Sequence, residues 1–462
     1  MPLLFIFTIL HLCLNQQNQK KTMANTTKDE GLKRVVGITG LSLNIINITV
    51  GAGIFALPAI VGLELGAFSV FAYIFCGVMM AAIMLCYAEI GTRITSTGGS
   101  YAYVEAAFGD FAGYIVTWLA VFGWSILGSA ALMNIIADSL SVIFPIFANP
   151  WIRGLLYFVL LGFLVVTNIR GAKEGVAFIK WITIIKLLPL FGIIIFGFGM
   201  INPDNLHWEH LPSLNTFSNS TLVLFFAFAG FETALGASGE IKNPKRTIPL
   251  GILLGGGLVM IIYLLLQTVT QGVFGAQMEL VKDAPLAAVA ERIVGSLGGT
   301  ILLVAAAISC FGAVSTDVLN TPRVLFAGAN DGLFPKFLGK VHPKFATPHW
   351  SIIIFAAVMF FFSVFANFKQ LALLASAAIL LIYLFVILAT IALRLKKQDT
   401  SEKIFKVPGG FIIPAIGIAS IIWLLSSLSK WEIIAISIFI AIIGIVYVTM
   451  KWIKKRAKSQ KT

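Results

Sequence analysis

Charged residues are scarce in this chain. Of its 462 residues only 11% are Asp, Glu, Lys or Arg, whereas 58% are hydrophobic. Water-soluble domains carry roughly 25% charged residues, and no packed soluble core could use so much apolar sequence. The composition therefore excludes a water-soluble protein. It predicts an all-α integral membrane protein, because a helix satisfies its own backbone hydrogen bonds in lipid.

Cysteines and the motifs of enzyme active sites are also few. Two histidines, His207 and His210, share one loop, for which we favour a solvated loop over a metal site. No metalloprotease motif, nucleophile elbow or phosphate loop is present, so we expect no enzymatic activity, no metal and no cofactor. The four cysteines are scattered, with no spacing that suggests a disulfide framework: Cys13, Cys76, Cys86 and Cys310.

Long apolar runs fill most of the chain instead. A membrane-spanning helix needs roughly 20 apolar residues, and short polar loops separate twelve runs of about this length or longer. The runs lie at 34–62, 66–90, 109–142, 151–169, 177–200, 217–240, 248–271, 298–329, 349–367, 370–394, 410–429 and 432–452. The segments 94–108 and 283–297 do not fit a span, and we expect them to lie along the two membrane surfaces.

Basic residues are divided unevenly between the two sides of these spans. With the N-terminus inside, 27 of the 33 Lys and Arg residues fall on the inner side and five on the outer side, while Lys186 lies within a span. This bias places both termini in the cytoplasm and predicts a multi-pass protein of the cell (inner) membrane. It also explains the net charge of +13 by contact with the lipid bilayer, without nucleic acid.

The first apolar run is too long for one straight span and is interrupted. Residues 34–62 would form a helix of roughly 43 Å at about 1.5 Å per residue, yet Gly51, Gly53 and Pro58 fall within it. The glycines favour local unwinding, and the proline deprives the Ile54 carbonyl of its helical partner. Free backbone groups at membrane depth are tolerated where they line a cavity. The resumed half-helix would point its positive N-terminus into the gap, where a carboxylate is the natural ligand, unless the break is only a packing kink.

A second interruption falls in the sixth run, at Phe228–Glu232. Unwound carbonyls there could accept hydrogen bonds from an ammonium group, and Glu232 would be expensive in lipid unless it faced the pathway. Two broken helices at corresponding places in two five-helix halves are typical of inverted-repeat transporters with a substrate at the midplane. We therefore expect a 5+5 inverted repeat with broken helices 1 and 6.

Lys186 lies in the middle of the fifth run. A charge near mid-membrane costs roughly 2.5–3.5 kcal/mol, and at about 16 Å from the inner face the side chain cannot snorkel to the surface. One interpretation is a structural lysine held by backbone carbonyls. We favour the other, in which its ammonium lies near the unwound first span and replaces a sodium ion or carries a proton.

These patterns divide the chain into five parts. Residues 1–33 form a cytoplasmic segment, 34–200 the first five-helix repeat, 217–394 the inverted second repeat, 410–452 two additional transmembrane helices and 453–462 a basic cytoplasmic tail. Residues 1–22 are apolar at their start but lack the features of a secretory signal. We predict that translation starts at Met23, and an intact mass that includes residues 1–22 would contradict this.

Four stretches together resemble the amino acid–polyamine–organocation (APC) transporter superfamily, over about residues 34–450. They are Gly51-Ala52-Gly53-Ile54-Phe55 with Pro58; Tyr87-Ala88-Glu89 with Gly98-Gly99-Ser100-Tyr101; Phe228-Ala229-Gly230-Phe231-Glu232 with Glu240, Asn243-Pro244, Arg246 and Ile248-Pro249; and Arg323, Ala327, Asp331-Gly332 and Pro335. The chain departs from the family pattern at Ser96-Thr97, where relatives often carry Pro, and at Thr49-Val50 ahead of Gly51.

The resemblance implies an α-amino acid permease of twelve transmembrane helices. The substrate carboxylate would meet N–H groups in the stretch Thr49, Val50, Gly51, Ala52, Gly53 and Ile54. The α-amino group would meet carbonyls in the stretch Phe228, Ala229, Gly230, Phe231 and Glu232, with Phe231 as a gate. A lysine in the fifth helix is similar to that of sodium-independent members, where it occupies the place of a sodium ion. This resemblance favours proton coupling or exchange, with Lys186 as the coupling residue and the proton as the expected coupling ion.

Some alternatives stay open at this point. The chain could be an amino acid or polyamine exchanger (an antiporter rather than a symporter) on the same fold, with Glu232 facing a second positive group. Glu89 and Arg93, at the inner end of the second span, are expected to pair with loop charges in a structural or gating salt bridge. Asp317 and Asp138 could each be a structural partner or part of a vestibule.

Overall fold

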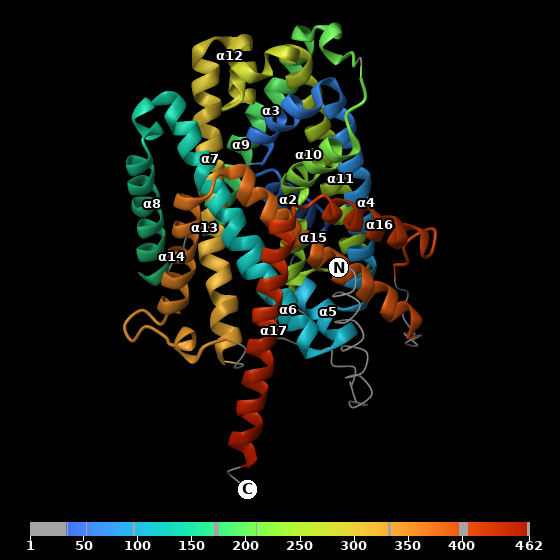
Figure 1. The fold of residues 1–462 in the computed structure, drawn as a ribbon, viewed down its shortest axis with the longest axis vertical. Coiled ribbons are helices and arrows are strands. Elements are labelled where there is room, and N and C mark those ends of the chain that lie inside the picture. Colours follow the sequence, from blue (N-terminus) through green and yellow to red (C-terminus); the bar gives the residue numbers. More distant parts are fainter. Residues whose placement is uncertain are drawn as a thin grey trace.

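A computed structural model shows a bundle of long helices (Figure 1). It describes residues 34, 36–51, 53–95, 98–170, 175–208, 210–330, 334–396 and 405–459. All named elements within these ranges are helices or short helical turns, and β-pairing is limited to one isolated bridge between Val36 and Ile241. The predicted start at Met23 lies outside the described residues.

The helices follow the apolar runs closely, because each run supplies enough hydrophobic length to form one. The main elements are α2 (Ile38–Thr49), α3 (Gly53–Leu65), α4 (Ser69–Arg93), α5 (Ser100–Phe108), α6 (Asp110–Trp118), η2 (Leu119–Ile126), α7 (Leu127–Ile143), α8 (Pro150–Arg170), α9 (Gly175–Gly197), α10 (Leu214–Phe228), η6 (Phe231–Glu240), α11 (Pro244–Phe274), α12 (Pro285–Val294), α13 (Ser296–Asn330), α14 (His349–Phe365), α15 (Phe368–Leu395), α16 (Ile412–Ser426) and α17 (Lys430–Ser459).

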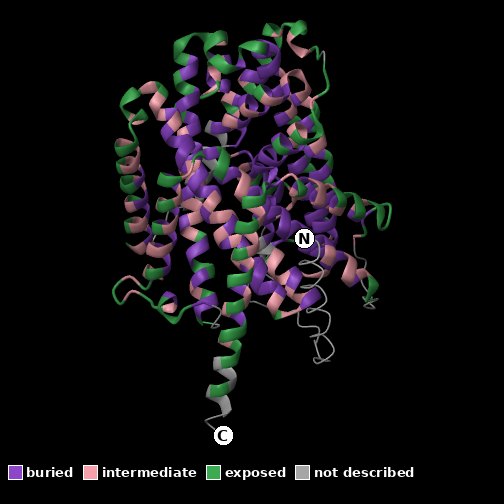
Figure 2. Cartoon of the chain, in the orientation of Figure 1, coloured by how far each residue is buried: buried purple, intermediate pink, exposed green. Residues whose placement is uncertain are grey.

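Membrane-spanning character is distributed over the whole bundle. Eight helical segments of the described chain are long and apolar enough to cross a membrane, and four shorter apolar helices accompany them. Helices α8 and α17 are the least buried of the long segments and lie at the periphery (Figure 2). Their exposed apolar side chains are placed to meet lipid. The protein is therefore a multi-pass, all-helical membrane protein.

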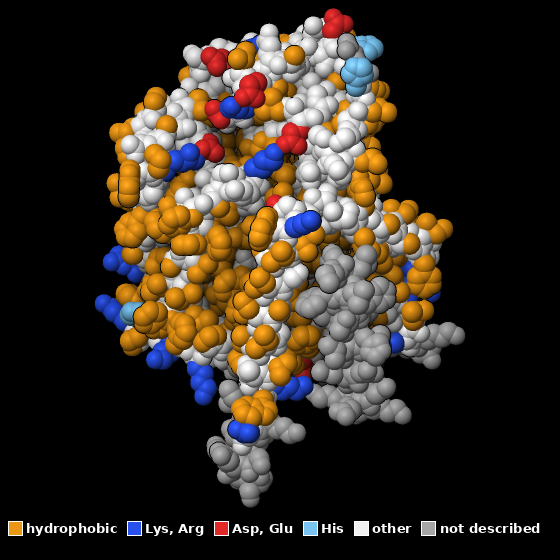
Figure 3. Space-filling model, viewed as in Figure 1, with side chains coloured by type: hydrophobic (Ala, Val, Ile, Leu, Met, Phe, Trp, Pro, Cys, Tyr) orange, Lys and Arg blue, Asp and Glu red, His pale blue; other side chains and the backbone are white. Residues whose placement is uncertain are grey.

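The two ends of the bundle carry different charges. Lys and Arg side chains gather at the end that holds α5 and the C-terminus of α17, whereas Asp and Glu are more visible at the end that holds α12 (Figures 1 and 3). We call these the basic end and the acidic end. The two segments expected to lie on opposite membrane surfaces thus form α5 and α12, although α5 also buries Tyr103 and Val104 against its neighbours.

A buried carboxylate organises the basic end. Glu89, at the end of α4, has no exposed surface. It accepts a hydrogen bond from Arg93 at 2.9 Å, from Arg394 Nε at 2.8 Å and through its other oxygen from Arg394 Nη2. The backbone N–H of Val407 donates to that second oxygen at 2.8 Å. Glu89 therefore ties α4 to α15 and to the chain that leads into α16. Within the described residues its salt bridges are to Arg93 of its own helix and to Arg394 of α15, not to the loop charges expected from the sequence.

Candidate functional site

Both predicted helix breaks are present, and they lie side by side. Helix α2 ends at Thr49 and α3 begins at Gly53, while α10 ends at Phe228 and η6 begins at Phe231. Gly230 has a φ of +111°, a conformation that residues with a Cβ rarely adopt. A Cβ on Gly53 would lie 2.9 Å from the Cα of Ala227. Glycine is thus required at both breaks, once for backbone conformation and once for close approach.

Tyr263 of α11 joins the two breaks. Its hydroxyl lies 2.7 Å from the Thr49 carbonyl oxygen and 3.0 Å from the Ala227 carbonyl oxygen. One O–H can donate to both only as a shared hydrogen bond. The side chain is completely buried. Tyr263 was not among the site residues expected from the sequence. Its sequence signal is a tyrosine within an apolar run, because a buried tyrosine hydroxyl usually has a hydrogen-bond partner.

We predict that Tyr263→Phe weakens substrate binding more than folding. Loss of a buried hydrogen bond costs about 0.5–1.5 kcal/mol, which corresponds to a KM roughly 2- to 12-fold higher if the breaks splay apart. The matched control is Tyr73→Phe, because the buried Tyr73 hydroxyl has no hydrogen-bond partner among the residues that the structure describes. Uptake kinetics and thermal unfolding of both variants check this. Equal KM values in the two variants would contradict a role for Tyr263 at the breaks.

A cavity of about 380 Å³ lies against the breaks. Its lining residues come from the two broken helices (α2 with α3, and α10 with η6) and from η2, α7, α9 and α13. Asn44 and Asn320 line it and are exposed, so it opens toward the basic end. Its lining comprises Asn44, Asn47, Ile48, Thr49, Gly51, Gly53, Trp124, Gly128, Ser129, Leu132, Lys186, Phe226, Ala227, Ala229, Gly230, Thr233, Ser309, Gly312, Ala313, Ser315, Thr316, Asp317, Leu319 and Asn320.

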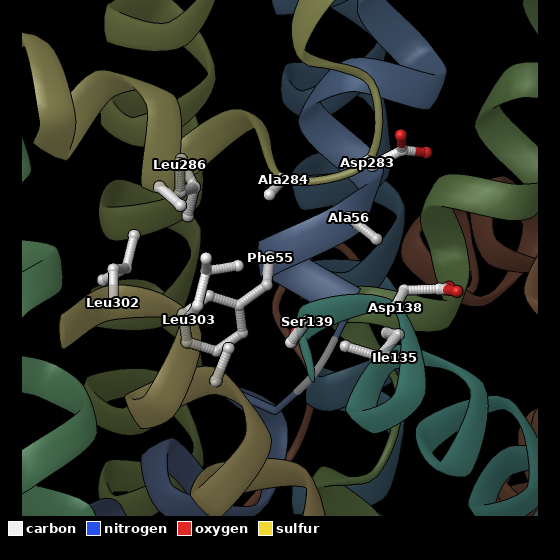
Figure 4. Close-up of a pocket in the computed structure, with 12 residues that line it drawn as sticks. Phe55, Ala56, Ile135, Asp138, Ser139, Asp283, Ala284, Leu286, Leu302 and Leu303 are labelled. Carbon is white, nitrogen blue, oxygen red and sulfur yellow. The ribbon is translucent and has the colours of Figure 1, made fainter. Parts of the chain in front are cut away.

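Toward the acidic end the helices close. The pocket there, of about 30 Å³, is large enough for only a water or two. Phe55 of α3 enters it between α7 and α13, beside Leu303 and Ile135 (Figure 4). Ion pairs at this end join Asp138 to Arg153 and Glu64 to Lys369. In the described part of the chain, the exposed lining residues Asn44 and Asn320 thus place the mouth of the large cavity at the basic end, while packed side chains and ion pairs occupy the acidic end.

Lys186 reaches the first break from α9. Its side chain is 4% exposed, and Nζ donates to the Asn47 carbonyl oxygen at 2.5 Å. In an unbroken helix that carbonyl would accept from the N–H of Gly51, but Gly51 N–H donates to Thr49 at 2.7 Å instead. The lysine thus supplies the donor that the break removes. Its position beside the unwound first span is the one expected from the sequence.

The structure divides the predicted site residues into two groups. Thr49, Gly51, Gly53, Ala229, Gly230 and Lys186 line the cavity. Val50, Ile54, Phe228, Phe231 and Glu232 are buried and are not among its lining residues. Ala52 lies outside the described residues.

The sequence predicted that Glu232 faces the cavity, and the structure shows that it does not line it. It accepts hydrogen bonds from the Tyr383 hydroxyl at 2.5 Å and from Gly230 N–H at 3.1 Å. Phe231 packs between Tyr87 and Tyr383 with ring centroids 5.1 and 5.6 Å away, so it does not cover the cavity in this conformation. These two side chains avoid the cavity because η6 directs them toward α4 and α15. There Tyr383 donates a hydrogen bond to Glu232, and Tyr87 and Tyr383 pack against Phe231.

Three residues that were not among the predicted site residues also line the cavity: Trp124, Ser129 and Asp317. Trp124 sits on η2, a π-helical stretch of the kind often found at functional sites. Ser129 of α7 donates to Asp317 of α13 at 2.6 Å. Asp317 and Lys186 are the two charged residues among the described lining residues. Of Trp124, Ser129 and Asp317, only Asp317 carried a sequence signal, an ionisable group within an apolar run.

Comparisons with known proteins agree with this architecture. The family described as "Amino acid permease" matches residues 35–450. The Serine/threonine exchanger SteT of Bacillus subtilis is 30% identical over 449 residues, covering 92% of this chain and 98% of that protein. From the same organism, the Methylthioribose transporter and the Branched-chain amino acid permease BcaP are each 26% identical, covering 92% of this chain and 95% and 94% of their own lengths. These proteins are transporters, not enzymes. The chain belongs to the amino acid permease family of the APC transporter superfamily.

Proposed function

We propose that this protein is a secondary active transporter of α-amino acids that works by alternating access. The observation that carries the proposal is the pair of adjacent helix breaks beside a cavity whose exposed lining lies toward the basic end. The N-terminus of α3, which begins at Gly53, would offer the substrate carboxylate its first N–H groups, for which a helix supplies no internal partner. The carbonyls around Ala229 accept from its ammonium group. Both charged ends of an amino acid are thereby satisfied by backbone alone.

We assign the basic end to the cytoplasm, since positive residues accumulate on that side of membrane proteins. Both termini are then cytoplasmic, and the conformation is inward-facing. The twelve predicted spans are assigned to a 5+5 inverted repeat followed by α16 and α17. Alternating access would reopen the acidic end by moving Phe55 away from α7 and α13 while closing the basic end.

Transport is proposed to be coupled to protons and independent of sodium. The ammonium of Lys186 occupies the carbonyl site at the first break where a cation is needed, so a sodium ion is not required there. An inward proton gradient would then drive uptake through protonation and deprotonation at this position.

Exchange of one amino acid for another is the second candidate. The relative that is 30% identical is named a serine/threonine exchanger, and the same pair of breaks serves an antiporter equally well. In that case Lys186 would act as a fixed structural cation.

Uptake of a panel of labelled amino acids into proteoliposomes distinguishes these functions. We expect uptake with an inward proton gradient and none from a sodium gradient alone. Stimulation only by preloaded amino acid would establish the exchanger. A requirement for sodium would contradict the role given to Lys186, and absence of any amino acid uptake under all three conditions would overturn the proposed function.

A further inference from the structure

The cavity contains a carboxylate that is not needed to bind the carboxylate and ammonium groups of an amino acid. Asp317 lies on α13, and one of its oxygens accepts a hydrogen bond from Ser129 Oγ at 2.6 Å. Among the described residues no Lys, Arg or His forms a salt bridge with it. Lys186, the other charged residue of the lining, donates to Asn47 at the first break.

This carboxylate has unused capacity to accept hydrogen bonds. A carboxylate offers about four acceptor positions on two oxygens, and Ser129 fills one of them. A charge withdrawn from bulk water without donors is costly. A ligand group that donates to Asp317 would offset that cost, whereas an apolar group would increase it by displacing water.

The position of Asp317 relative to the breaks specifies which part of a ligand it meets. The breaks belong to α2, α3, α10 and η6, while Ser129 and Asp317 come from two other elements of the cavity lining, α7 and α13. An amino acid held by its carboxylate and ammonium at the breaks extends its side chain away from them. Gly128, Gly312 and Ala313 also line this region, and their small side chains leave room for that side chain.

We propose that Asp317 recognises the substrate side chain and that Ser129 acts as its positioning residue. This inference rests on the proposed function. The pair selects amino acids whose side chain donates a hydrogen bond, through a hydroxyl or an ammonium group, over apolar side chains of similar length. Asp317, and not Glu232, is then the carboxylate that meets a second positive group, because Glu232 is engaged by Tyr383 outside the cavity lining.

The test compares matched substrates in one protein, so that differences in folding cancel. In proteoliposomes we expect kcat/KM at least tenfold higher for serine than alanine, for lysine than norleucine, or for both. A preference for serine alone would show that Asp317 selects a neutral hydrogen-bond donor. A preference for lysine alone would show that it selects a cationic side chain. A wild-type protein that transports amino acids without either preference overturns this inference and leaves the proposed function standing; one that transports none overturns the proposed function.

Variants assign the preference to Asp317. Asp317→Leu should bring both kcat/KM ratios, serine over alanine and lysine over norleucine, to within about threefold of unity. Asp317→Asn should abolish the lysine preference and keep the serine preference, since the amide oxygen still accepts a hydrogen bond. Ser129→Ala should lower the ratios and Ser129→Thr should restore them. Asp204→Asn, an acid-to-amide change at an exposed site, is the control. Wild-type ratios in Asp317→Leu would overturn the assignment.

Discussion

Replacement of Lys186 by methionine is expected to reduce proton-driven uptake roughly 10- to 150-fold while the protein remains folded in the membrane. The variant removes a charged donor from the Asn47 carbonyl, and hydrogen bonds to charged groups contribute about 1.5–3 kcal/mol. Methionine fills a similar volume, so the cavity wall is kept. Loss of the charge also removes the group proposed to respond to the proton gradient.

The measurement is initial uptake into proteoliposomes with and without an inward proton gradient. Lys430→Met is a suitable control, because Lys430 is exposed at the start of α17, away from the cavity. Exchange against preloaded substrate should be measured in the same preparations. Unchanged proton-driven uptake by the Lys186→Met protein would overturn its coupling role, and loss of both modes would indicate that the ammonium holds the first break in shape.

Among the proposed substitutions, replacement of Glu89 by glutamine is expected to lower the free energy of unfolding the most. Glu89 is fully buried between Arg93 and Arg394. Removal of one partner from a buried ionic cluster costs about 3–5 kcal/mol, because the remaining charges are left uncompensated. The two arginines would then repel each other at the junction of α4 and α15.

Thermal unfolding in detergent measures this effect. The matched control is Glu279→Gln, since Glu279 and its partner Lys282 are both more than half exposed and exposed ion pairs contribute about 0–1 kcal/mol. We expect a clearly lower unfolding temperature for Glu89→Gln alone. The molecules that remain folded should keep their KM, because Glu89 is absent from the cavity lining. Equal unfolding temperatures in the two variants would contradict the stabilising role of the cluster.

Several features of the candidate site were predictable because they depend on local sequence. The glycines at positions 51, 53 and 230 weaken a helix wherever they occur, so the break positions followed from residue type. The depth of Lys186 followed from counting residues along an apolar run. The family resemblance added which side of each break was expected to meet the substrate.

By itself, the sequence determined that this chain is an all-helical, multi-pass membrane protein with two interrupted helices and a lysine inside an apolar run. Hydrophobic length and backbone preference act within a single segment, so these properties are readable without coordinates. Only the tertiary structure decided which charged residues face the cavity. Ser129 and Asp317 are 188 positions apart, and Glu232 meets Tyr383 from 151 positions away. The direction of a side chain and its partners depend on how distant helices pack, and that packing turned Glu232 away from the cavity and brought Asp317 into it.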